Sequence, residues 1–466
     1  MLFNSFQFAL FLVTVVAFHR SAPREWRNGI LLAASLVFYF LWIPPYLALL
    51  LVDLLVNYAL VRGIQRSSRK RLYVAASVVF SLGILAGFKY TAFLVGSLTD
   101  LPVPEILLPL GVSFFTFQII ALSVDSYRGA TPAVQSFREY ALFISFFPQL
   151  VAGPILRGSM FLPQLRAGGR VSSDRTRRGA WLLASGLVKK VVLADFLLAP
   201  YVDDVFQGAG IPTSLELWVA LYSFAFQIYC DFSGYTDMAR GMGLLLGFEL
   251  PKNFTEPYLS RNPAEFWQRW HITLSTWLRD YLFLTLGGNR HGRLRSLRNL
   301  SVTMVLGGLW HGAAWTFVLW GAYHGVLLVL HRTLQPVLVR VAPGSSAGRL
   351  AWQALRVAVT FHLVCLGYLV FRAESLAQLG GLLPVLGGLT GSAGDTVSWP
   401  GVQLGIVALC AGLHGLERIV RPRLPAIRRA LEPMWGGVLE GAAMGAVVAL
   451  AIWLGGAGGE FIYFQF

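Results

Sequence analysis

Long apolar blocks dominate this chain and restrict what it can fold into. They lie at residues 6–18, 29–43, 45–61, 72–97, 106–123, 139–155, 180–200, 215–232, 300–330, 352–371, 401–415 and 437–456. Many approach the roughly 20 apolar residues of a membrane-spanning helix, and none shows the alternation of a membrane β-barrel. Charged residues make up 13% of the 466 residues, whereas a soluble domain carries about 25%. We therefore predict an all-α polytopic membrane protein in which residues 1–466 form a single integral membrane domain.

The charges between the blocks predict an orientation. Arg and Lys are frequent in the loops 62–71, 156–178, 251–299, 331–350 and 416–431, and absent from 98–105, 201–214 and 374–400. Basic loops face the cytoplasm. The two sets alternate if 139–155 is re-entrant and 300–330 is a hairpin, which predicts about 11–12 transmembrane helices. The net charge of +15 then indicates loops that face anionic membrane lipid, and no nucleic-acid partner is expected.

The N-terminal block and the cysteines support the same class. The first 20 residues have no basic segment before the apolar run and no small-residue cleavage site, so we expect a retained span and not a signal peptide. Cys230, Cys365 and Cys410 have apolar neighbours and no paired spacing. We expect them to be small buried side chains, and we expect no disulfide framework and no metal site.

The interval Arg261–Phe283 is the most informative stretch outside the predicted spans. Asn262, Pro263 and Glu265 form a helix-start pattern. Apolar side chains then follow helical spacing on one face: Trp267, Trp270, His271, Leu274, Trp277, Leu278 and Tyr281. This predicts an amphipathic helix at the membrane interface, with its tryptophans in an aromatic belt. Its apolar face carries one titratable group, His271, which is either a core residue or part of a site.

A second histidine lies inside a predicted span. The stretch "GGLWHGAAWTFVLWGAYHG" runs from Gly307 to Gly325 and contains His311 and His324. An ionisable group at that depth is costly, and His311 is therefore a functional candidate. The small residues beside it would let a ligand or another backbone approach: Gly307, Gly308, Gly312 and Ala313. For His324, we favour a structural role.

A buried imidazole suits general-base chemistry. Burial favours its neutral form, which can accept a proton from a hydroxyl that attacks an acyl thioester. A second polar group would orient the base or stabilise the oxyanion. The chain has no G-x-S-x-G elbow, P-loop or H-E-x-x-H motif. This argues against a covalent serine enzyme, an ATPase and a zinc protease, and leaves base-assisted acyl transfer open.

Five segments resemble the membrane-bound O-acyltransferase (MBOAT) superfamily, and within it the bacterial alginate O-acetyltransferase branch. They are "LPLGVSFFTFQIIALSVDSYRG" (108–129), "FFPQLVAGPILR" (146–157), "QIYCDFSGYTDMARGMGLLLGFELPKNFTEPY" (227–258), "EFWQRWHITLSTWLRDYLF" (265–283) and "GGLWHG" (307–312). The resemblance covers about residues 1–331, and the C-terminal spans, about 352–456, carry none of its motifs. One departure is "LFLTLGGNRHG" (282–292), which lacks the proline that the family often has before the glycines.

The resemblance implies an MBOAT fold, in which transmembrane, re-entrant and interfacial helices surround a central funnel. It implies that His311 is the base or acyl-transfer centre and that His271 assists it. It also implies cytoplasmic acetyl-CoA as the acyl donor with no bound cofactor, a place in the bacterial inner membrane, and an exported polysaccharide as the indirect acceptor. Because this chain has no such domain, a separate extracytoplasmic SGNH-type acetyltransferase is the implied partner.

Other residues are candidates for the substrate path. Those expected to line the funnel are Trp310, Ser113, Gln118, Trp267, Trp270, Asp231, Tyr235 and Asp237. For the three on the stretch 231–237, the alternative is helix capping and interhelical hydrogen bonding at the end of a span. Arg269 and Arg279 are candidates for binding the donor phosphates, or for contacting lipid. Two other functions stay open: a non-enzymatic conduit for acyl donor or polysaccharide, and D-alanyl transfer to teichoic acid.

Overall fold

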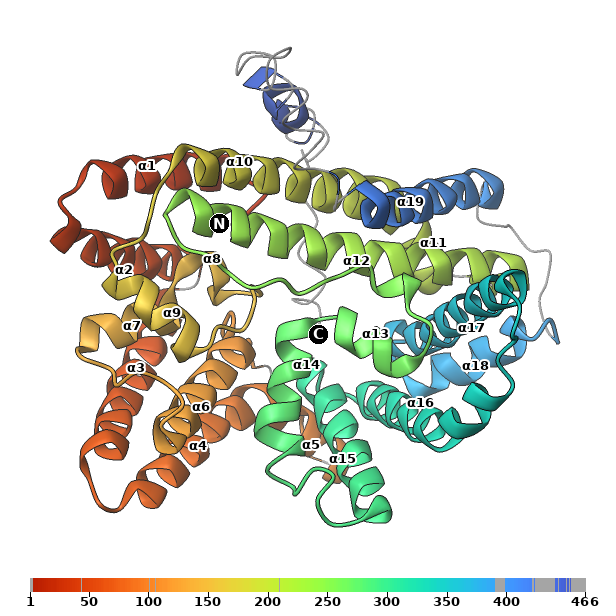
Figure 1. Ribbon diagram of the computed structural model, residues 1–466, viewed down its shortest axis with the longest axis horizontal. Helices are drawn as coiled ribbons and strands as arrows, with labels where there is room; N and C mark the ends of the chain where they lie inside the picture. The colour runs from red at the N-terminus through yellow and green to blue at the C-terminus, as the bar shows by residue number, and fades with distance from the viewer. Residues whose placement is uncertain are drawn as a thin grey trace. The chain divides into compact units, whose positions relative to one another are not determined.

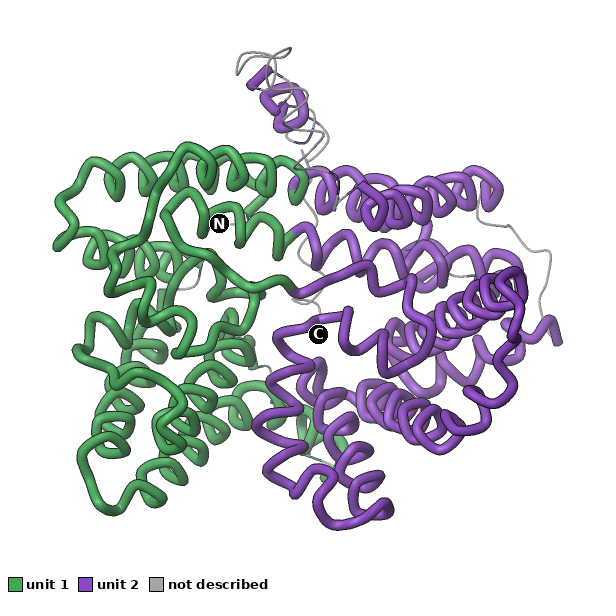
Figure 2. Tube along the Cα trace, viewed as in Figure 1, with its two compact units in different colours: residues 1–186, 235–252 green, residues 187–234, 253–466 purple. Residues whose placement is uncertain are grey.

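Every regular element that the computed structural model describes is a helix (Figure 1). The structure describes residues 3–42, 44–99, 101–104, 106–208, 210–389, 399–420, 423, 441–442, 444–449, 451 and 453. The chain forms two compact units: unit 1 comprises residues 1–186 and 235–252, and unit 2 comprises residues 187–234 and 253–466 (Figure 2). Half of the last predicted span, 437–456, lies outside the described residues.

Unit 1 holds the N-terminal helices. They are α1 (Phe6–Ser21), α2 (Arg24–Phe40), α3 (Pro44–Arg66), α4 (Lys70–Leu85), η1 (Ala86–Tyr90), α5 (Thr91–Leu98), α6 (Val112–Arg128), α7 (Phe137–Ser145), α8 (Phe147–Leu150), α9 (Gly158–Arg166) and α10 (Ser173–Leu187). Side-chain hydrogen bonds join α3 to α4: Asn57 donates to Ser81 Oγ at 3.2 Å and accepts from Ser77 Oγ at 2.7 Å. Polar pairs of this kind hold helices together where apolar solvent offers no partner.

The stretch predicted to be re-entrant, 139–155, contains one short helix, α8, and most of another, α7. Helix α7 has nine residues and α8 has four, so neither is long enough to cross a bilayer of about 30 Å. From Glu139 to Leu150 every side chain is buried.

Unit 2 holds the rest of the helices. They are η2 (Val188–Leu198), α11 (Ala199–Gln207), α12 (Ser214–Leu245), η3 (Pro257–Leu259), α13 (Pro263–Arg269), α14 (Ile272–Trp277), η4 (Leu278–Phe283), α15 (Arg293–His311), α16 (Trp315–Arg340), α17 (Ser346–Arg372), α18 (Leu376–Leu386) and α19 (Pro400–Val420). The part of α12 from Tyr235 onward belongs to unit 1. Residues 231–237 lie inside α12, which continues for two more turns to Leu245.

Five helical stretches in the described chain are long and apolar enough to cross a membrane. They are Pro44–Arg66, Lys70–Leu98, Trp315–Arg340, Ser346–Arg372 and Pro400–Val420. The shorter apolar helices α1 and α18 lie below that length. The chain is therefore a polytopic helical membrane protein.

The block 300–330 is the predicted hairpin, made of α15 and α16. Glycines let the two backbones touch: a Cβ on Gly308 would lie 2.2 Å from the Phe317 carbonyl oxygen, and one on Gly321 would lie 2.4 Å from that of Met304. The small residues were predicted to admit a ligand or another backbone, and at Gly308 it is the backbone of α16 that approaches. This approach brings the end of α15, and with it His311, against α16.

The stretch 263–283 differs from the expected continuous helix. Its start is confirmed, because Asn262 Oδ1 accepts a hydrogen bond from the Glu265 amide at 2.8 Å. The helix breaks at Trp270–His271, and residues 278–283 take a π-helical form. All seven side chains of the predicted apolar stripe are buried in the protein. The aromatic-belt interpretation is therefore wrong for Trp267, Trp270 and Trp277, since protein and not lipid covers them.

Candidate active site

His271 occupies the break between α13 and α14. Its backbone is left-handed, with φ 42° and ψ 55°, and its side chain is fully buried. Non-glycine residues adopt this conformation rarely, and such residues concentrate at functional sites. The break turns the chain, so that His271 does not continue the surface of α13.

His311 is the last residue of α15. The next residue, Gly312, is extended and ends the helix. A Cβ on Gly312 would lie 2.0 Å from the Phe317 ring, so only glycine fits there. His311 is 4% exposed and therefore buried at the point where the hairpin turns.

The structure brings His271 and His311 together. Their ring centroids are 6.5 Å apart, and the ring planes are inclined at 67°. Trp310 touches both rings, with centroids at 6.1 Å from His271 and 5.0 Å from His311. Both histidines belong to unit 2. Two groups that are far apart in the sequence thus share one buried location.

Aromatic side chains enclose the pair. Phe232 of α12 lies edge-on to His271 at 4.6 Å. Trp320 of α16 and Phe371 of α17 contact His311 at 5.0 and 5.7 Å. Apolar walls exclude water and strengthen electrostatic interactions within the site. Trp320 and Phe371 were missed in the sequence, because nothing in their spacing relates them to His311.

Burial controls the charge of His271, which lies outside the five long apolar helices. It lowers the pKa of this imidazole from 6.5 to about 3. The ring is therefore neutral at physiological pH. A neutral imidazole can accept a proton or orient a neighbouring base.

His324 lies further along α16, in a separate contact. Its ring is 4.9 Å from Trp320 and 5.2 Å from Trp267. Its Nε2 faces Gly367 of α17, where a Cβ would come within 2.8 Å. This tight packing between α16 and α17 supports the structural role expected for His324.

The candidate lining residues divide between the two units. Trp310, Trp267, Trp270 and Asp231 belong to unit 2, and Ser113, Gln118, Tyr235 and Asp237 belong to unit 1. Gln118 donates to the Phe143 carbonyl at 2.6 Å and accepts from Gln149 at 2.9 Å. Asp237 pairs with Arg240 at 3.0 Å. Gln118 therefore bonds between helices, which was not among the expectations for it. The Asp237–Arg240 pair lies within α12.

Asp231 has a buried cation as its partner. Lys190 Nζ lies 2.6 Å from Asp231 Oδ1 and 2.9 Å from Asp195 Oδ1. The side chains of Lys190 and Asp231 are only 5% and 2% exposed. This lysine was not predicted as a site residue, although two adjacent lysines inside the apolar block 180–200 were a visible signal. Asp231 directly precedes Phe232, the residue that supports His271.

The two candidate phosphate-binding arginines have different surroundings. Arg269 is held by Glu265 at 2.7 Å and is partly buried. Arg279 is 61% exposed and pairs with the adjacent Asp280 at 2.7 Å. Arg279 is the more accessible of the two. In the part of the chain that the structure describes, no cluster of three or more His, Cys, Asp or Glu residues could hold a metal ion.

These features define a polytopic helical membrane protein with a buried pair of histidines. The chain belongs to the MBOAT, membrane-bound O-acyltransferase, family, whose model matches residues 123–369. It is therefore an acyltransferase. The matched range contains both histidines and their aromatic neighbours Phe232, Trp310 and Trp320.

The curated relatives are named as O-acetylases, an O-acetyltransferase and D-alanyltransferases. The chain is 41% identical over 387 residues to "Probable alginate O-acetylase AlgI" of Azotobacter vinelandii, covering 80% of this chain and 75% of the relative. It is 36% identical to the peptidoglycan O-acetyltransferase of Helicobacter pylori, covering 80% and 74%. It is 26% identical to the teichoic acid D-alanyltransferase of Bacillus subtilis, covering 57% and 69%.

Proposed function

We propose that this chain is a membrane O-acetyltransferase of the bacterial inner membrane. It takes an acetyl group from cytoplasmic acetyl-CoA and passes it across the membrane for O-acetylation of an exported polysaccharide. The observation that carries the proposal is the enclosure of His271 and His311 in one buried aromatic site. The identity to alginate and peptidoglycan acetyltransferases over four fifths of the chain supports the acetyl group.

In the proposed reaction His311 is the general base. Its neutral imidazole takes the proton of an acceptor hydroxyl while the hydroxyl oxygen attacks the thioester carbonyl carbon. The tetrahedral intermediate collapses, the C–S bond breaks, and the imidazolium returns the proton to the departing thiolate. His271, kept neutral by burial, orients the reacting groups or stabilises the oxyanion by donating a hydrogen bond.

The donor enters from the side of the basic loops, and Arg279 contacts its phosphates. Arginine binds phosphate well because its planar guanidinium offers several donors. The acceptor is carried by a separate extracytoplasmic partner of the SGNH acetyltransferase type, which completes transfer to the polysaccharide. This chain has no polar interval long enough to form such a domain.

Transfer of a D-alanyl group is the second candidate function. It is supported by the match to teichoic acid D-alanyltransferases, at 26–27% identity over 56–57% of this chain. The higher identity and longer match to acetyltransferases favour acetyl. A non-enzymatic conduit is the third alternative, and it differs in one testable respect: transfer through a conduit needs the shape of the path but no base at position 311.

The test uses sealed membrane vesicles that contain the full chain and its co-expressed extracytoplasmic partner. Acetyl-labelled acetyl-CoA is supplied on the cytoplasmic side, and label on the partner or polysaccharide is measured. The variants are His311→Gln and, as a matched control, His362→Gln, because His362 is an exposed histidine on α17. A parallel assay supplies labelled D-alanyl thioester.

We expect wild type and His362→Gln to transfer acetyl, and His311→Gln to lose transfer although it is present in equal amount. Equal transfer by His311→Gln would overturn the assignment of the base and favour the conduit. Transfer of D-alanyl without acetyl would replace the proposed acyl group.

A further inference from the structure

The backbone at His271 needs support from the surrounding structure. With φ 42° and ψ 55°, it lies in the left-handed region, where the Cβ of an L-residue is crowded. A conformation of this kind persists only when neighbouring contacts hold it. The contacts that hold it therefore determine where the imidazole points.

One buried residue, Asn253, holds the two residues that follow His271. The Asn253 carbonyl accepts the Ile272 amide at 2.9 Å. Its side-chain Oδ1 accepts both the Thr273 amide at 3.2 Å and the Thr273 hydroxyl at 2.6 Å. Asn253 is fully buried, so water does not compete for these bonds. Asn253 thus accepts three hydrogen bonds from the first turn of α14 and fixes that turn.

Residues that follow Asn253 in the chain also bind Arg269, which lies before His271. The Thr255 amide donates to the Arg269 carbonyl at 3.0 Å, and Arg269 Nη1 donates to the Glu256 carbonyl at 3.4 Å. Glu256 is itself left-handed, with φ 39°. Residues 253–256, which we call the cradle segment, are therefore bonded to the chain on both sides of His271.

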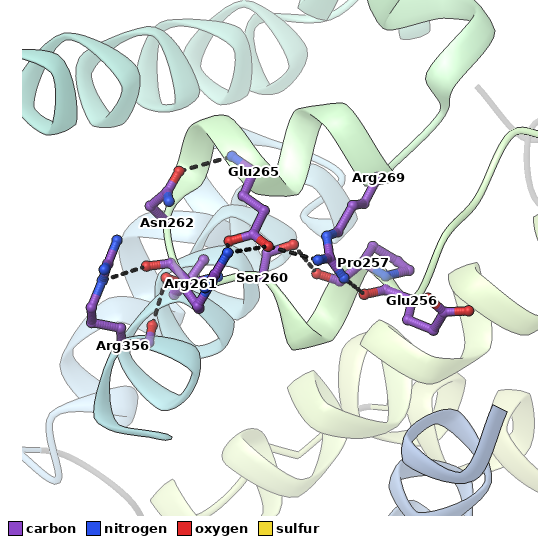
Figure 3. A network of polar contacts seen from close by, with 9 residues as sticks. Glu256, Pro257, Ser260, Arg261, Asn262, Glu265, Arg269 and Arg356 are labelled. Atoms are coloured by element: carbon purple, nitrogen blue, oxygen red, sulfur yellow. Dashed lines mark hydrogen bonds and ion pairs between the residues drawn. The ribbon is translucent and has the colours of Figure 1, made fainter. Parts of the chain in front are cut away.

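Arg269, which donates to Glu256 of the cradle segment, also belongs to an ion network around Glu265 (Figure 3). The Glu265 carboxylate lies between Arg269 at 2.7 Å and Arg261 at 3.0 Å. Burial raises the pKa of Glu265, but hydrogen bonds from Arg261 and the charges of both arginines outweigh it and hold the pKa below its usual value. Arg356 of α17 donates to the Arg261 carbonyl at 3.2 Å. The helix start at α13 is thereby tied to α17 as well.

We propose that Asn253 is a positioning residue for acyl transfer: it holds residues 271–273 in the turn that directs the His271 ring toward His311. The inference rests on the proposed function of the histidine pair. Asn253 acts through hydrogen bonds to Ile272 and Thr273, and His271 in turn packs on Phe232 at 4.6 Å and faces His311 at 6.5 Å.

The test compares substitutions on both sides of the Asn253–Thr273 bond. Thr273→Val removes the hydroxyl at nearly constant volume, and Thr273→Ser retains it. Asn253→Ala removes both side-chain acceptor bonds. Thr276→Val is the matched control, because the Thr276 hydroxyl donates only to carbonyls of its own helix, at 2.9 and 3.0 Å. His311→Gln is included as the test of the proposed function itself.

The readouts are kcat and KM for acetyl-CoA per folded molecule, and the pH dependence of kcat. We expect Thr273→Val and Asn253→Ala to lower kcat about 10-fold to 100-fold with little change in KM, because a small misplacement of a reacting group has this effect. Thr273→Ser and Thr276→Val should stay near wild type. In the impaired variants a loosened turn exposes His271 to water, its pKa rises from about 3 toward 6.5, and kcat falls further between pH 7 and pH 5.5.

Several outcomes would overturn the inference. If Thr273→Val and Asn253→Ala lower only the amount of folded protein, and kcat and its pH profile match wild type, Asn253 supports the fold alone. If Thr273→Ser lowers kcat as much as Thr273→Val does, loss of the hydroxyl hydrogen bond is not the cause of the lower kcat. Suppose that His311→Gln loses activity while the Asn253 and Thr273 variants keep a normal kcat. That result rejects the positioning role of Asn253 and is consistent with the proposed function. Unimpaired His311→Gln rejects the proposed function first.

Discussion

The imidazole rings of His271 and His311 lie 6.5 Å apart, centroid to centroid, with Trp310 in contact with both. One ring comes from a break between two short helices, and the other from the last residue of α15. At this distance the two rings are neighbours in one buried location.

The two histidines are expected to act as a unit. His311→Gln should abolish acetyl transfer, and His271→Gln should lower kcat by about 100-fold, within the range of general acid–base and oxyanion contributions. The double variant should be no worse than His311→Gln, since residues that act together are non-additive. Steady-state transfer rates at matched protein levels provide the measurement. Additive losses would indicate independent roles.

Lys190→Met is expected to destabilise the protein strongly. It leaves Asp231, whose side chain is 2% exposed, without its cation, and breaking a buried pair costs about 3–5 kcal/mol. Lys189→Met is the control: that neighbouring lysine lies 4.0 Å from Glu417 and both side chains are partly exposed, so about 1 kcal/mol or less is expected. Thermal unfolding in detergent measures both. A Lys190→Met protein as stable as Lys189→Met would contradict the burial of this pair.

Gly308→Ala should separate the hairpin helices and displace His311. Its new methyl would lie 2.2 Å from the Phe317 carbonyl oxygen, and overpacking of this kind costs about 1–3 kcal/mol. Gly325→Ala on α16 is the matched control, because its nearest neighbour would lie at an ordinary 3.4 Å. We expect reduced melting temperature and transfer for Gly308→Ala only. The two variants behaving alike would argue against the close packing of α15 and α16.

Burial of His271 predicts a pH-dependent stability. Its pKa is about 3 in the folded protein and 6.5 when exposed, so the unfolded chain binds an extra proton between these values. The stabilising contribution is complete above pH 6.5 and is lost as the pH falls toward 3, by up to about 1.4 kcal/mol per pH unit. Unfolding curves from pH 7.5 to 5 should show this slope, and His271→Gln should reduce it. An unchanged slope in His271→Gln would assign the effect to other groups.

Arg279→Gln should weaken donor binding without slowing chemistry. The side chain is 61% exposed, and loss of one phosphate contact should raise KM for acetyl-CoA about 3-fold to 10-fold at unchanged kcat, as expected for uniform binding. High salt should reduce the difference. Arg418→Gln, in the last turn of α19, serves as the control. Equal KM values in wild type and Arg279→Gln would leave lipid contact as the role of Arg279.

Several features of this structure were predictable from local patterns in the sequence. Composition and block length predicted a polytopic helical membrane protein, because a long apolar helix satisfies its own backbone in lipid. The Asn262 cap was predicted from the residue types around it, and the hairpin at 300–330 from the length of the apolar block. The apolar stripe of 267–281 was predicted from its spacing, but its burial inside the protein was not. Each of these depends on residues within a few turns of one another.

Tertiary structure decided the features that join distant segments. The left-handed turn at His271 depends on Asn253, and the burial of Asp231 depends on Lys190. Helical periodicity predicted an unbroken helix through position 271. Periodicity depends only on nearby residues, so it does not include the hydrogen bonds to Asn253 that stabilise the break. The sequence determined by itself which side chains are apolar, which are basic and where helices begin. No local pattern encodes contacts between distant elements, so before the folded chain placed His271 beside His311 only the family resemblance implied that the two act together.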